Sequence, residues 1–122
     1  MTHPPPAISV IVPTHNRSVV LRRLLDALGA QEHYPINRFE VVVVADGCTD
    51  DTHALLRAYH APYTLRRFIQ PGQGVAVARN RGAAEAQAPL LLFIDDDVVP
   101  GPATIATHVA AHRTIERLIA IG

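Results

Sequence analysis

Residues 90–97 read LLLFIDDD, an apolar run of five residues that leads directly into three aspartates. The same order recurs at residues 39–46, FEVVVVAD, where four consecutive valines precede a single aspartate. Uninterrupted runs of this kind are typical of strands buried on both faces of a parallel sheet. Residues 7–12, AISVIV, form a similar run, and residues 64–69 a weaker one. The predicted strands are 7–12, closed by Pro13, then 39–45, 64–69 and 90–94.

Segments with helical features separate these strands. Residues 18–28 carry leucines at the spacing of one helix face, and Gly29 supplies a stop signal after them. Residues 75–88 are rich in alanine; Gly82 within them indicates a helix packed closely on the sheet, and Pro89 ends it. The other predicted elements are a helix at 52–59, a helix from about Pro102 and a fifth strand at 118–121. Strands alternating with helices predict an α/β fold, with a mostly parallel sheet flanked by helices.

The composition indicates one compact globular domain. The chain has 122 residues, of which 48% are hydrophobic and 18% charged, with 11 basic and 11 acidic side chains. Because the charges balance, nucleic acid is not expected as a partner. No apolar stretch approaches the roughly 20 residues needed to cross a bilayer.

The N-terminus and the cysteine content bear on location. Residues 1–6 hold three prolines and no secretory signal, so we expect a flexible arm followed by one domain over residues 7–122. The single Cys48 excludes an internal disulfide and fits a reducing cytosol. We therefore expect a cytoplasmic protein, with peripheral attachment to the inner face of the membrane left open.

Polar residues follow three of the predicted strands, at residues 14–17, 46–51 and 95–97. In open parallel sheets, ligands bind beyond the carboxyl ends of the strands, so we expect the functional site where these segments meet. If the strand geometry continues, Asp95 and Asp97 point to one face, where two charges ~6–7 Å apart repel by about 2.5 kcal/mol at an effective dielectric of about 20. A bound cation would relieve that repulsion.

The chemistry of these side chains favours a hard cation. Carboxylate oxygens without neighbouring cysteines suit Mg²⁺ or Mn²⁺, which complete their coordination with phosphate oxygens and water. A diphosphate ligand is therefore implied. The alternative is that the aspartates form a solvated turn and cap the following helix.

Two further segments offer groups for a nucleotide. Asp46 can accept a hydrogen bond from a base imide or a ribose hydroxyl, or it can merely open a tight turn with Gly47. Residues 13–17, PTHNR, supply hydroxyl, amide and guanidinium groups that suit a nucleoside and a phosphate. On the alanine-rich helix, periodicity does not decide whether Arg79 or Arg81 faces the site.

Together these segments resemble the family 2 glycosyltransferases of the GT-A fold, inverting enzymes that use nucleotide-diphosphate sugars. The matching segments are ISVIVPTHNR (8–17), VVVVADGCTDDT (41–52), GVAVARNRGAAEA (74–86) and LLLFIDDDVVPGP (90–102). They occur in the family's order across nearly the whole chain, which makes a chance match improbable.

The resemblance implies roles for individual residues in binding the nucleotide sugar. Pro13 and Thr14 would line the nucleoside pocket, and Arg17 lies in the same matching segment. Asp46 would bind the base, and Arg79 would contact the nucleotide.

The acidic run would be the Asp-x-Asp motif of this family. Asp95 would lie near the ribose and the sugar phosphate and share in holding the metal, whereas Asp97 would bind Mn²⁺ or Mg²⁺ directly. Asp96 is expected to be a spectator. A UDP-sugar is the favoured donor, and the acceptor is an unspecified sugar or lipid.

The family's acceptor-binding half, with its general base, would lie beyond Gly122. We therefore expect residues 7–122 to be the nucleotide-sugar-binding part of the domain, with no catalytic residue in the chain. A fragment, a truncated reading frame and completion by a second chain or a homo-oligomer all stay open. The resulting hypothesis is metal-dependent binding of a nucleotide-diphosphate sugar as the donor half of an inverting glycosyltransferase. The alternative is a non-catalytic truncated remnant or a regulatory nucleotide-binding module.

Other signals are weaker. His108 and His112 lie four residues apart on a predicted helix but lack the glutamate of an HExxH zinc site. A sugar-1-phosphate nucleotidyltransferase shares the broad architecture, but it carries a basic, glycine-rich segment after the first strand, unlike residues 13–17. We assign neither reading to this chain.

Overall fold

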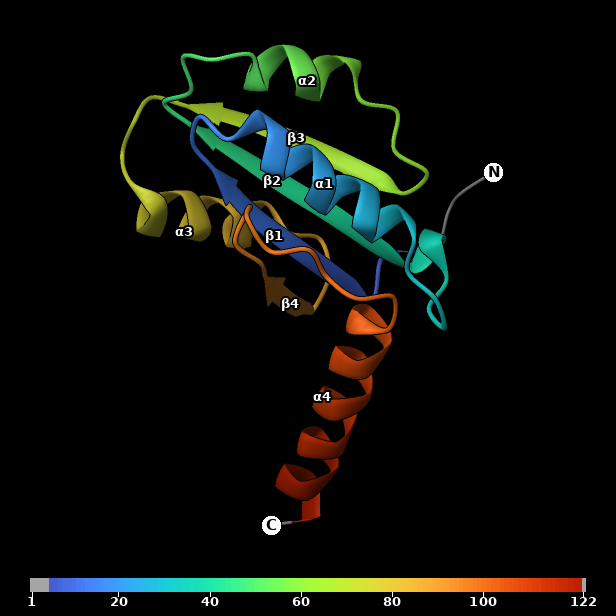
Figure 1. Cartoon of the computed structure of the whole chain (residues 1–122). Coiled ribbons are helices and arrows are strands. Elements are labelled where there is room, and N and C mark those ends of the chain that lie inside the picture. Colours follow the sequence, from blue (N-terminus) through green and yellow to red (C-terminus); the bar gives the residue numbers. More distant parts are fainter. Residues whose placement is uncertain (1–4, 122) are drawn as a thin grey trace.

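The computed structural model describes the backbone of residues 5–121 and the side chains of residues 5–112. Four parallel strands form one sheet in the order β3-β2-β1-β4 (Figure 1). The strands are β1 (Ile8–Thr14), β2 (Phe39–Asp46), β3 (Thr64–Gln70) and β4 (Leu90–Phe93). The helices are α1 (Ser18–Gly29), α2 (Thr52–Ala58), α3 (Val75–Glu85) and α4 (Thr104–Ile121), with a short 3-10 helix η1 (Ile36–Arg38). The predicted α/β fold with a parallel sheet flanked by helices is confirmed.

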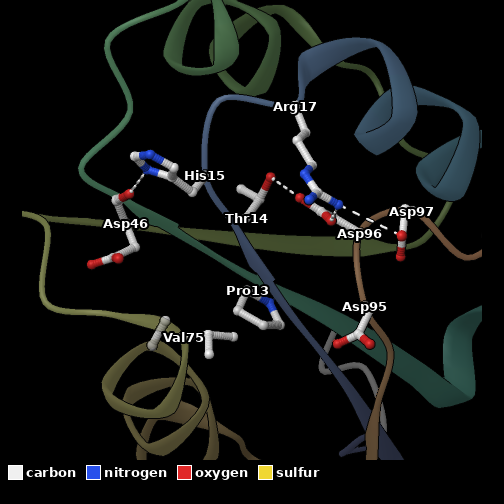
Figure 2. A pocket seen from close by; sticks show the side chains of 10 residues that line it. Pro13, Thr14, His15, Arg17, Asp46, Val75, Asp95, Asp96 and Asp97 are labelled. Atoms are coloured by element: carbon white, nitrogen blue, oxygen red, sulfur yellow. Dashed lines mark hydrogen bonds and ion pairs between the residues drawn. The ribbon is translucent and has the colours of Figure 1, made fainter.

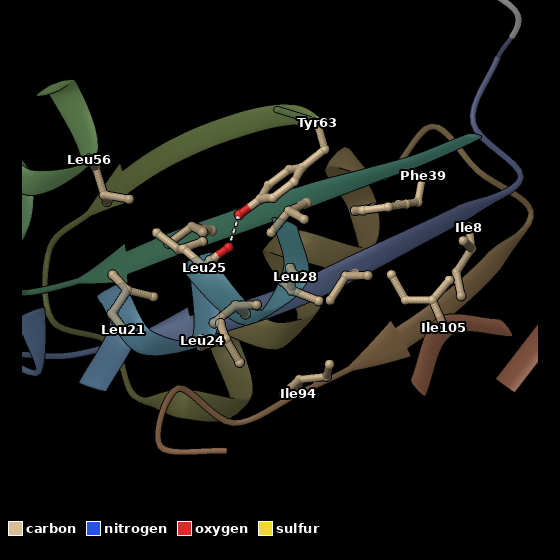
Figure 3. Close-up of a cluster of buried hydrophobic side chains, with 14 of the residues drawn as sticks. Ile8, Leu21, Leu24, Leu25, Leu28, Phe39, Leu56, Tyr63, Ile94 and Ile105 are labelled. Atoms are coloured by element: carbon tan, nitrogen blue, oxygen red, sulfur yellow. Dashed lines mark hydrogen bonds between the residues drawn. The ribbon is translucent and has the colours of Figure 1, made fainter. Parts of the chain in front are cut away.

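The strands bury side chains on both faces of the sheet. Val10 and Val12 of β1 belong to the cluster packed under α1, whereas Ile11 belongs to a second cluster with α3. Figure 3 shows the leucines of α1 over the sheet, where the Tyr63 hydroxyl donates a hydrogen bond to the Leu25 carbonyl at 2.7 Å. The buried leucines of α1 are Leu21, Leu24, Leu25 and Leu28. Burying each such side chain contributes about 1.5–3 kcal/mol, which holds the strands in place.

Helix α3 packs on the opposite face with a very close approach at Gly82. A Cβ at this position would lie 2.4 Å from Cγ2 of Ile11, which is fully buried in β1. Ala78, one turn earlier, is also fully buried. The close packing predicted from the glycine is confirmed, because only a residue without a side chain fits between the helix and the strand.

A buried carboxylate ties the end of α3 to the sheet. Glu40 is 1% exposed and accepts hydrogen bonds from the Ser9 hydroxyl at 2.5 Å and from the Gln87 N–H at 2.7 Å. The Ala88 N–H donates to the same Ser9 hydroxyl at 3.1 Å. Because these N–H groups bond to the sheet instead of continuing the helix, α3 ends at Glu85. The predicted helix to Ala88 was therefore too long.

The prediction that the first strand closes at Pro13 is wrong. Strand β1 continues through Thr14, and Pro13 lies opposite Val44 of β2. In a strand, residues two apart face the same neighbour, so Pro13 faces β4, as Ile11 does. The pairing of β4 with β1 ends at Ile11, apart from the Ile94 N–H that donates to the Ile11 carbonyl at 3.0 Å. The missing N–H of Pro13 therefore costs no ladder hydrogen bond.

One further prediction is confirmed and one is wrong. Helix α1 ends at Gly29, the predicted stop, and a Cβ there would lie 3.2 Å from Cγ of Pro62, so this glycine also serves a close approach. The predicted fifth strand at 118–121 is wrong, because these residues continue α4. No glycine or proline interrupts residues 104–121, and nothing in that segment stops a helix once it has begun.

The two ends of the chain bear on the remaining predictions. Residues 1–4 of the predicted arm lie outside the described residues, and Pro5 and Pro6 lie before β1 without regular structure. Helix α4 begins beside the sheet and runs away from it (Figure 1). Among the described residues, none of the helices combines the length and apolar character needed to cross a bilayer.

We expect Gly82→Ala to destabilise the fold although alanine is the better helix former. The gain in helix propensity is about 1 kcal/mol, whereas forcing a methyl group against buried Ile11 costs typically about 1–3 kcal/mol. Urea denaturation measures the net change. Gly101→Ala is the control, because a Cβ there meets nothing closer than the Thr104 hydroxyl at 3.8 Å. Equal or greater stability of Gly82→Ala would contradict the close packing.

Candidate functional site

The carboxyl ends of β1 and β2 and the turn after β4 surround a cavity of about 290 Å³ (Figure 2). Its lining contains six of the predicted site residues: Pro13, Thr14, Arg17, Asp46, Asp95 and Asp97. Three elements distant in sequence supply them, because parallel strands place their carboxyl ends at one edge of the sheet. Of the other lining residues, His15 and Asp96 belong to the segments expected to meet at the site, whereas Val75 and Ala78 of α3 were not predicted.

The acidic run leaves the strand before it reaches the cavity. Strand β4 ends at Phe93, and the Val98 N–H donates to the Asp95 carbonyl at 3.1 Å, which closes a turn. The strand geometry on which the predicted alternation of the three aspartates rested therefore does not continue through them. The side chains of Asp95 and Asp97 are 59% and 57% exposed. Their oxygens are accessible to a ligand.

Asp96 differs from its neighbours because it is buried, with 7% exposure. It accepts hydrogen bonds from the Thr14 hydroxyl at 2.9 Å and from the Arg17 guanidinium at 3.4 Å. This carboxylate thus anchors the turn to the end of β1, a structural role that was not predicted for it from the sequence. Its partner Thr14 lies 82 positions earlier in the chain, so no local sequence pattern announces the contact.

Two arginines pair with the exposed carboxylates. Arg79 on α3 places Nη2 2.8 Å from Oδ1 of Asp95, and Arg17 places Nη1 3.6 Å from Oδ2 of Asp97. Arg81 instead donates to the Ile69 carbonyl at 2.9 Å, on β3. The structure therefore distinguishes the two arginines that helical periodicity could not, and brings Arg79 to the acidic run.

Asp46 is 7% exposed at the end of β2 and binds the loop that leads into α3. Its Oδ1 accepts from the Gln70 side chain at 2.9 Å and from the Gln73 N–H at 2.8 Å, and its Oδ2 accepts from the Gly74 N–H at 3.0 Å. These hydrogen bonds, the Gln70 side chain first, lower the pKa of Asp46 below its ordinary value of 3.8. The carboxylate is therefore ionised at neutral pH and acts only as an acceptor.

The backbone around Asp46 needs two glycines. Gly47 has φ +63° and approaches Gly72 so closely that a Cβ would lie 2.8 Å from the Gly72 Cα, and Gly74 has φ +98°. Side chains rarely adopt such positive φ values. His15 supports the same corner, since its Nδ1 lies 2.6 Å from the Asp46 carbonyl oxygen and donates to it. The end of β1 thereby holds the end of β2.

Asn16 serves the scaffold more than the cavity. It has φ +50°, a conformation that asparagine tolerates better than most residues, and its side-chain oxygen accepts from the Thr49 N–H at 2.7 Å and the Asp50 N–H at 3.2 Å. Asp50 in turn accepts from the Thr52 N–H at 3.0 Å, at the start of α2. The loop after β1 is thus tied to the start of α2.

Asp95 and Asp97 are the residues of the cavity that would hold a hard divalent cation. Asp95 and Asp97 offer exposed carboxylate oxygens, and the part of the chain that the structure describes contains no cluster of three or more His, Cys, Asp or Glu side chains poised for a metal. Mg²⁺ and Mn²⁺ suit such a partial ligand set, because phosphate oxygens and water fill the remaining positions. The His108 and His112 rings stack 6.1 Å apart on α4, away from the cavity.

Comparison with known proteins identifies relatives of the whole segment. The model of the family "Glycosyl transferase family 2" matches residues 9–122. Validoxylamine A glucosyltransferase of Streptomyces hygroscopicus subsp. limoneus is 43% identical over 109 residues, which cover 88% of this chain and 24% of the relative. The hyaluronan synthase of Pasteurella multocida is 33% identical over 118 residues, 94% of this chain and 12% of that protein. The chain thus spans about a quarter or less of the length of these relatives.

Solved structures show the same fold. S. aureus TarS 1–349 in complex with UDP superposes with a TM-score of 0.77 at 32% identity, covering 84% of this chain and 31% of that one. The mannosyltransferase PcManGT from Pyrobaculum calidifontis, in complex with GDP-Man and Mn²⁺, gives a TM-score of 0.78 at 31% identity, covering 86% and 32%. In both alignments more than a quarter of the residues are identical, so the similarity extends to the sequence as well as the fold.

We expect Asp46→Asn to loosen the loop that leads into α3. Asparagine presents only one carbonyl oxygen, so the Gln73 and Gly74 N–H groups lose a charged acceptor worth about 1.5–3 kcal/mol. Hydrogen exchange at these two amides should accelerate by roughly tenfold or more. Asp51→Asn is the control, because Asp51 is exposed and makes no side-chain capping bond.

Hydrogen exchange at the Gln73 and Gly74 amides also measures how the stability contributed by Asp46 depends on pH. Because the native pKa of Asp46 lies below its ordinary value of 3.8, the stability it contributes is fully present above that value. It is lost only as the pH falls through the lower native pKa. Protection of Gln73 and Gly74 that disappears well above pH 4 would contradict this assignment.

Proposed function

This chain belongs to glycosyltransferase family 2, and on that premise we propose that it binds a nucleotide-diphosphate sugar together with a divalent cation, as the donor half of an inverting glycosyltransferase. The observation that carries the proposal is the cavity in which exposed Asp95 and Asp97 lie beside the cationic groups of Arg17 and Arg79. Carboxylates for the cation and guanidinium groups for a diphosphate thus occur at the end of one sheet.

The nucleoside takes the part of the cavity nearer β2. Pro13 and Thr14 form one wall, and Asp46 accepts from the base. Three hydrogen bonds engage the carboxylate of Asp46, which leaves about one of its four lone-pair sites for a ligand. An ionised acceptor suits the ring N–H of uracil or guanine, whereas adenine and cytosine lack that ring N–H and offer only an exocyclic amino group. The UDP in the TarS structure and the GDP-Man in the PcManGT structure support this choice, and a UDP-sugar is our favoured donor.

The diphosphate lies toward the acidic run. Asp97 holds the cation directly, and Asp95 shares in holding it beside the ribose and the sugar phosphate. When bound, Mn²⁺ or Mg²⁺ stabilises the negative charge of the departing diphosphate. The guanidinium groups of Arg17 and Arg79 donate to its oxygens, for which their planar geometry is well suited.

Inverting transfer also requires a general base that deprotonates the acceptor hydroxyl. We assign no residue of this segment to that role, and we propose that a region outside residues 7–122 provides the base and binds the sugar or lipid acceptor. The Mn²⁺ in the PcManGT structure supports the choice of cation. The role of this segment is therefore to bind and orient the donor.

We expect calorimetry to show UDP or GDP binding that strengthens with Mn²⁺, with ADP binding much more weakly. Asp97→Asn should lower the Mn²⁺-dependent affinity for the nucleotide by about tenfold or more. Loss of a residue that only hydrogen-bonds to a metal ligand already costs about tenfold to a hundredfold in metal affinity. Asp51→Asn, which changes an exposed aspartate at the N-cap of α2, should leave the nucleotide affinity unchanged. Absence of nucleotide binding in Mn²⁺, or full Mn²⁺ dependence in Asp97→Asn, would overturn the proposed site.

A further inference from the structure

The acidic run already has two positively charged partners within the protein. Oδ1 of Asp95 lies 2.8 Å from the Arg79 guanidinium, and Oδ2 of Asp97 lies 3.6 Å from that of Arg17. The two arginines come from different elements, one from the start of α1 and the other from α3. They balance most of the charge that three successive aspartates bring to one turn.

Both ion pairs are open to water. The side chains of Arg17 and Arg79 are 55% and 42% exposed, and those of their partners Asp97 and Asp95 are similarly exposed. Exposed ion pairs are weak and exchange easily for other charged partners. These contacts compensate charge without locking the side chains in place.

Other arginines of the chain have different surroundings. Arg66 is 25% exposed and pairs with buried Glu40 at 3.3 Å, and it also donates to the Glu85 carbonyl. Arg81 donates to the Ile69 carbonyl and lies over the Phe68 ring, 5.3 Å from its centroid. These two side chains hold the fold together, whereas Arg17 and Arg79 border the candidate site.

A divalent cation and the arginines compete for the same atoms. Arg79 contacts an oxygen of Asp95, and Arg17 contacts an oxygen of Asp97 at 3.6 Å and one of buried Asp96 at 3.4 Å. Asp95 and Asp97 are the carboxylates proposed to hold the cation. A cation on these oxygens also repels the neighbouring guanidinium groups. Cation binding therefore weakens the Arg17–Asp97 and Arg79–Asp95 pairs and frees guanidinium donors beside the site for phosphate oxygens.

We propose that Arg17 and Arg79 are resident counter-ions of the acidic run that move to the diphosphate when a divalent cation takes the carboxylates. The exchange makes the cation and the nucleotide bind cooperatively. The cation frees the two arginines for the diphosphate, and the diphosphate neutralises the positive charge of the freed arginines. The inference rests on the proposed function and adds a second role for the two arginines: in the empty site they oppose the cation, and in the loaded site they assist it.

The test measures Mn²⁺ binding by electron paramagnetic resonance, without nucleotide and with UDP, in wild type, Arg79→Gln and Arg17→Gln. Without nucleotide, we expect each variant to bind Mn²⁺ about two- to fivefold more tightly than wild type, because an exposed ion pair no longer competes. With Mn²⁺ present, we expect UDP to bind each variant about tenfold or more weakly. Arg81→Gln, two residues from Arg79, should change neither affinity.

The opposite signs of the two effects separate this inference from simpler roles. If the variants bind Mn²⁺ alone as wild type does, or more weakly, the arginines are not counter-ions that oppose the cation and the inference is wrong. If wild type binds neither Mn²⁺ nor UDP, the proposed function fails as well. The exchange is supported if wild type binds both ligands and the variants bind Mn²⁺ alone more tightly but UDP more weakly.

Discussion

The parallel pairing of β1 with β2 and β4 is the constraint on which the rest of the structure depends. In this register Thr14 lies opposite Ala45, next to Asp46, and Ile11 lies opposite Phe93, just before the acidic run. A shift by one residue would turn the strands' alternating side chains to the wrong face. Burial on both faces therefore fixes the register, and the register brings three polar segments to one end of the sheet.

The shortness of β4 shapes the site as much as the pairing does. Because β4 ends at Phe93 while β1 continues to Thr14, the acidic run turns across the end of β1 instead of extending the sheet. Asp96 is thereby buried against Thr14, and its neighbours on either side face the solvent. One aspartate anchors the turn so that two others are presented to a ligand, and the arginines of α1 and α3 compensate the exposed charges.

Local patterns in the sequence were sufficient to predict the fold class and that the candidate site residues meet at one end of the sheet. Apolar runs mark strands because burial on both faces demands them, and a glycine in an alanine-rich helix marks a close approach. What these patterns missed depends on contacts between distant residues. The end of α3 depends on Ser9 and Glu40, and the role of Asp96 depends on Thr14, so neither has a local signal. Pro13 was misplaced because its effect depends on where β4 ends.

The most direct test of the proposed site locates the cation. In a ¹⁵N-labelled sample with UDP, substoichiometric Mn²⁺ broadens the amide signals of residues near the ion. We expect residues 14–17 and 95–99 to broaden first, while Ile36–Arg38 in η1, before the opposite end of β2, stay sharp. Broadening centred on His108 and His112, or no selective broadening in the presence of UDP, would contradict a nucleotide and cation site at the strand ends.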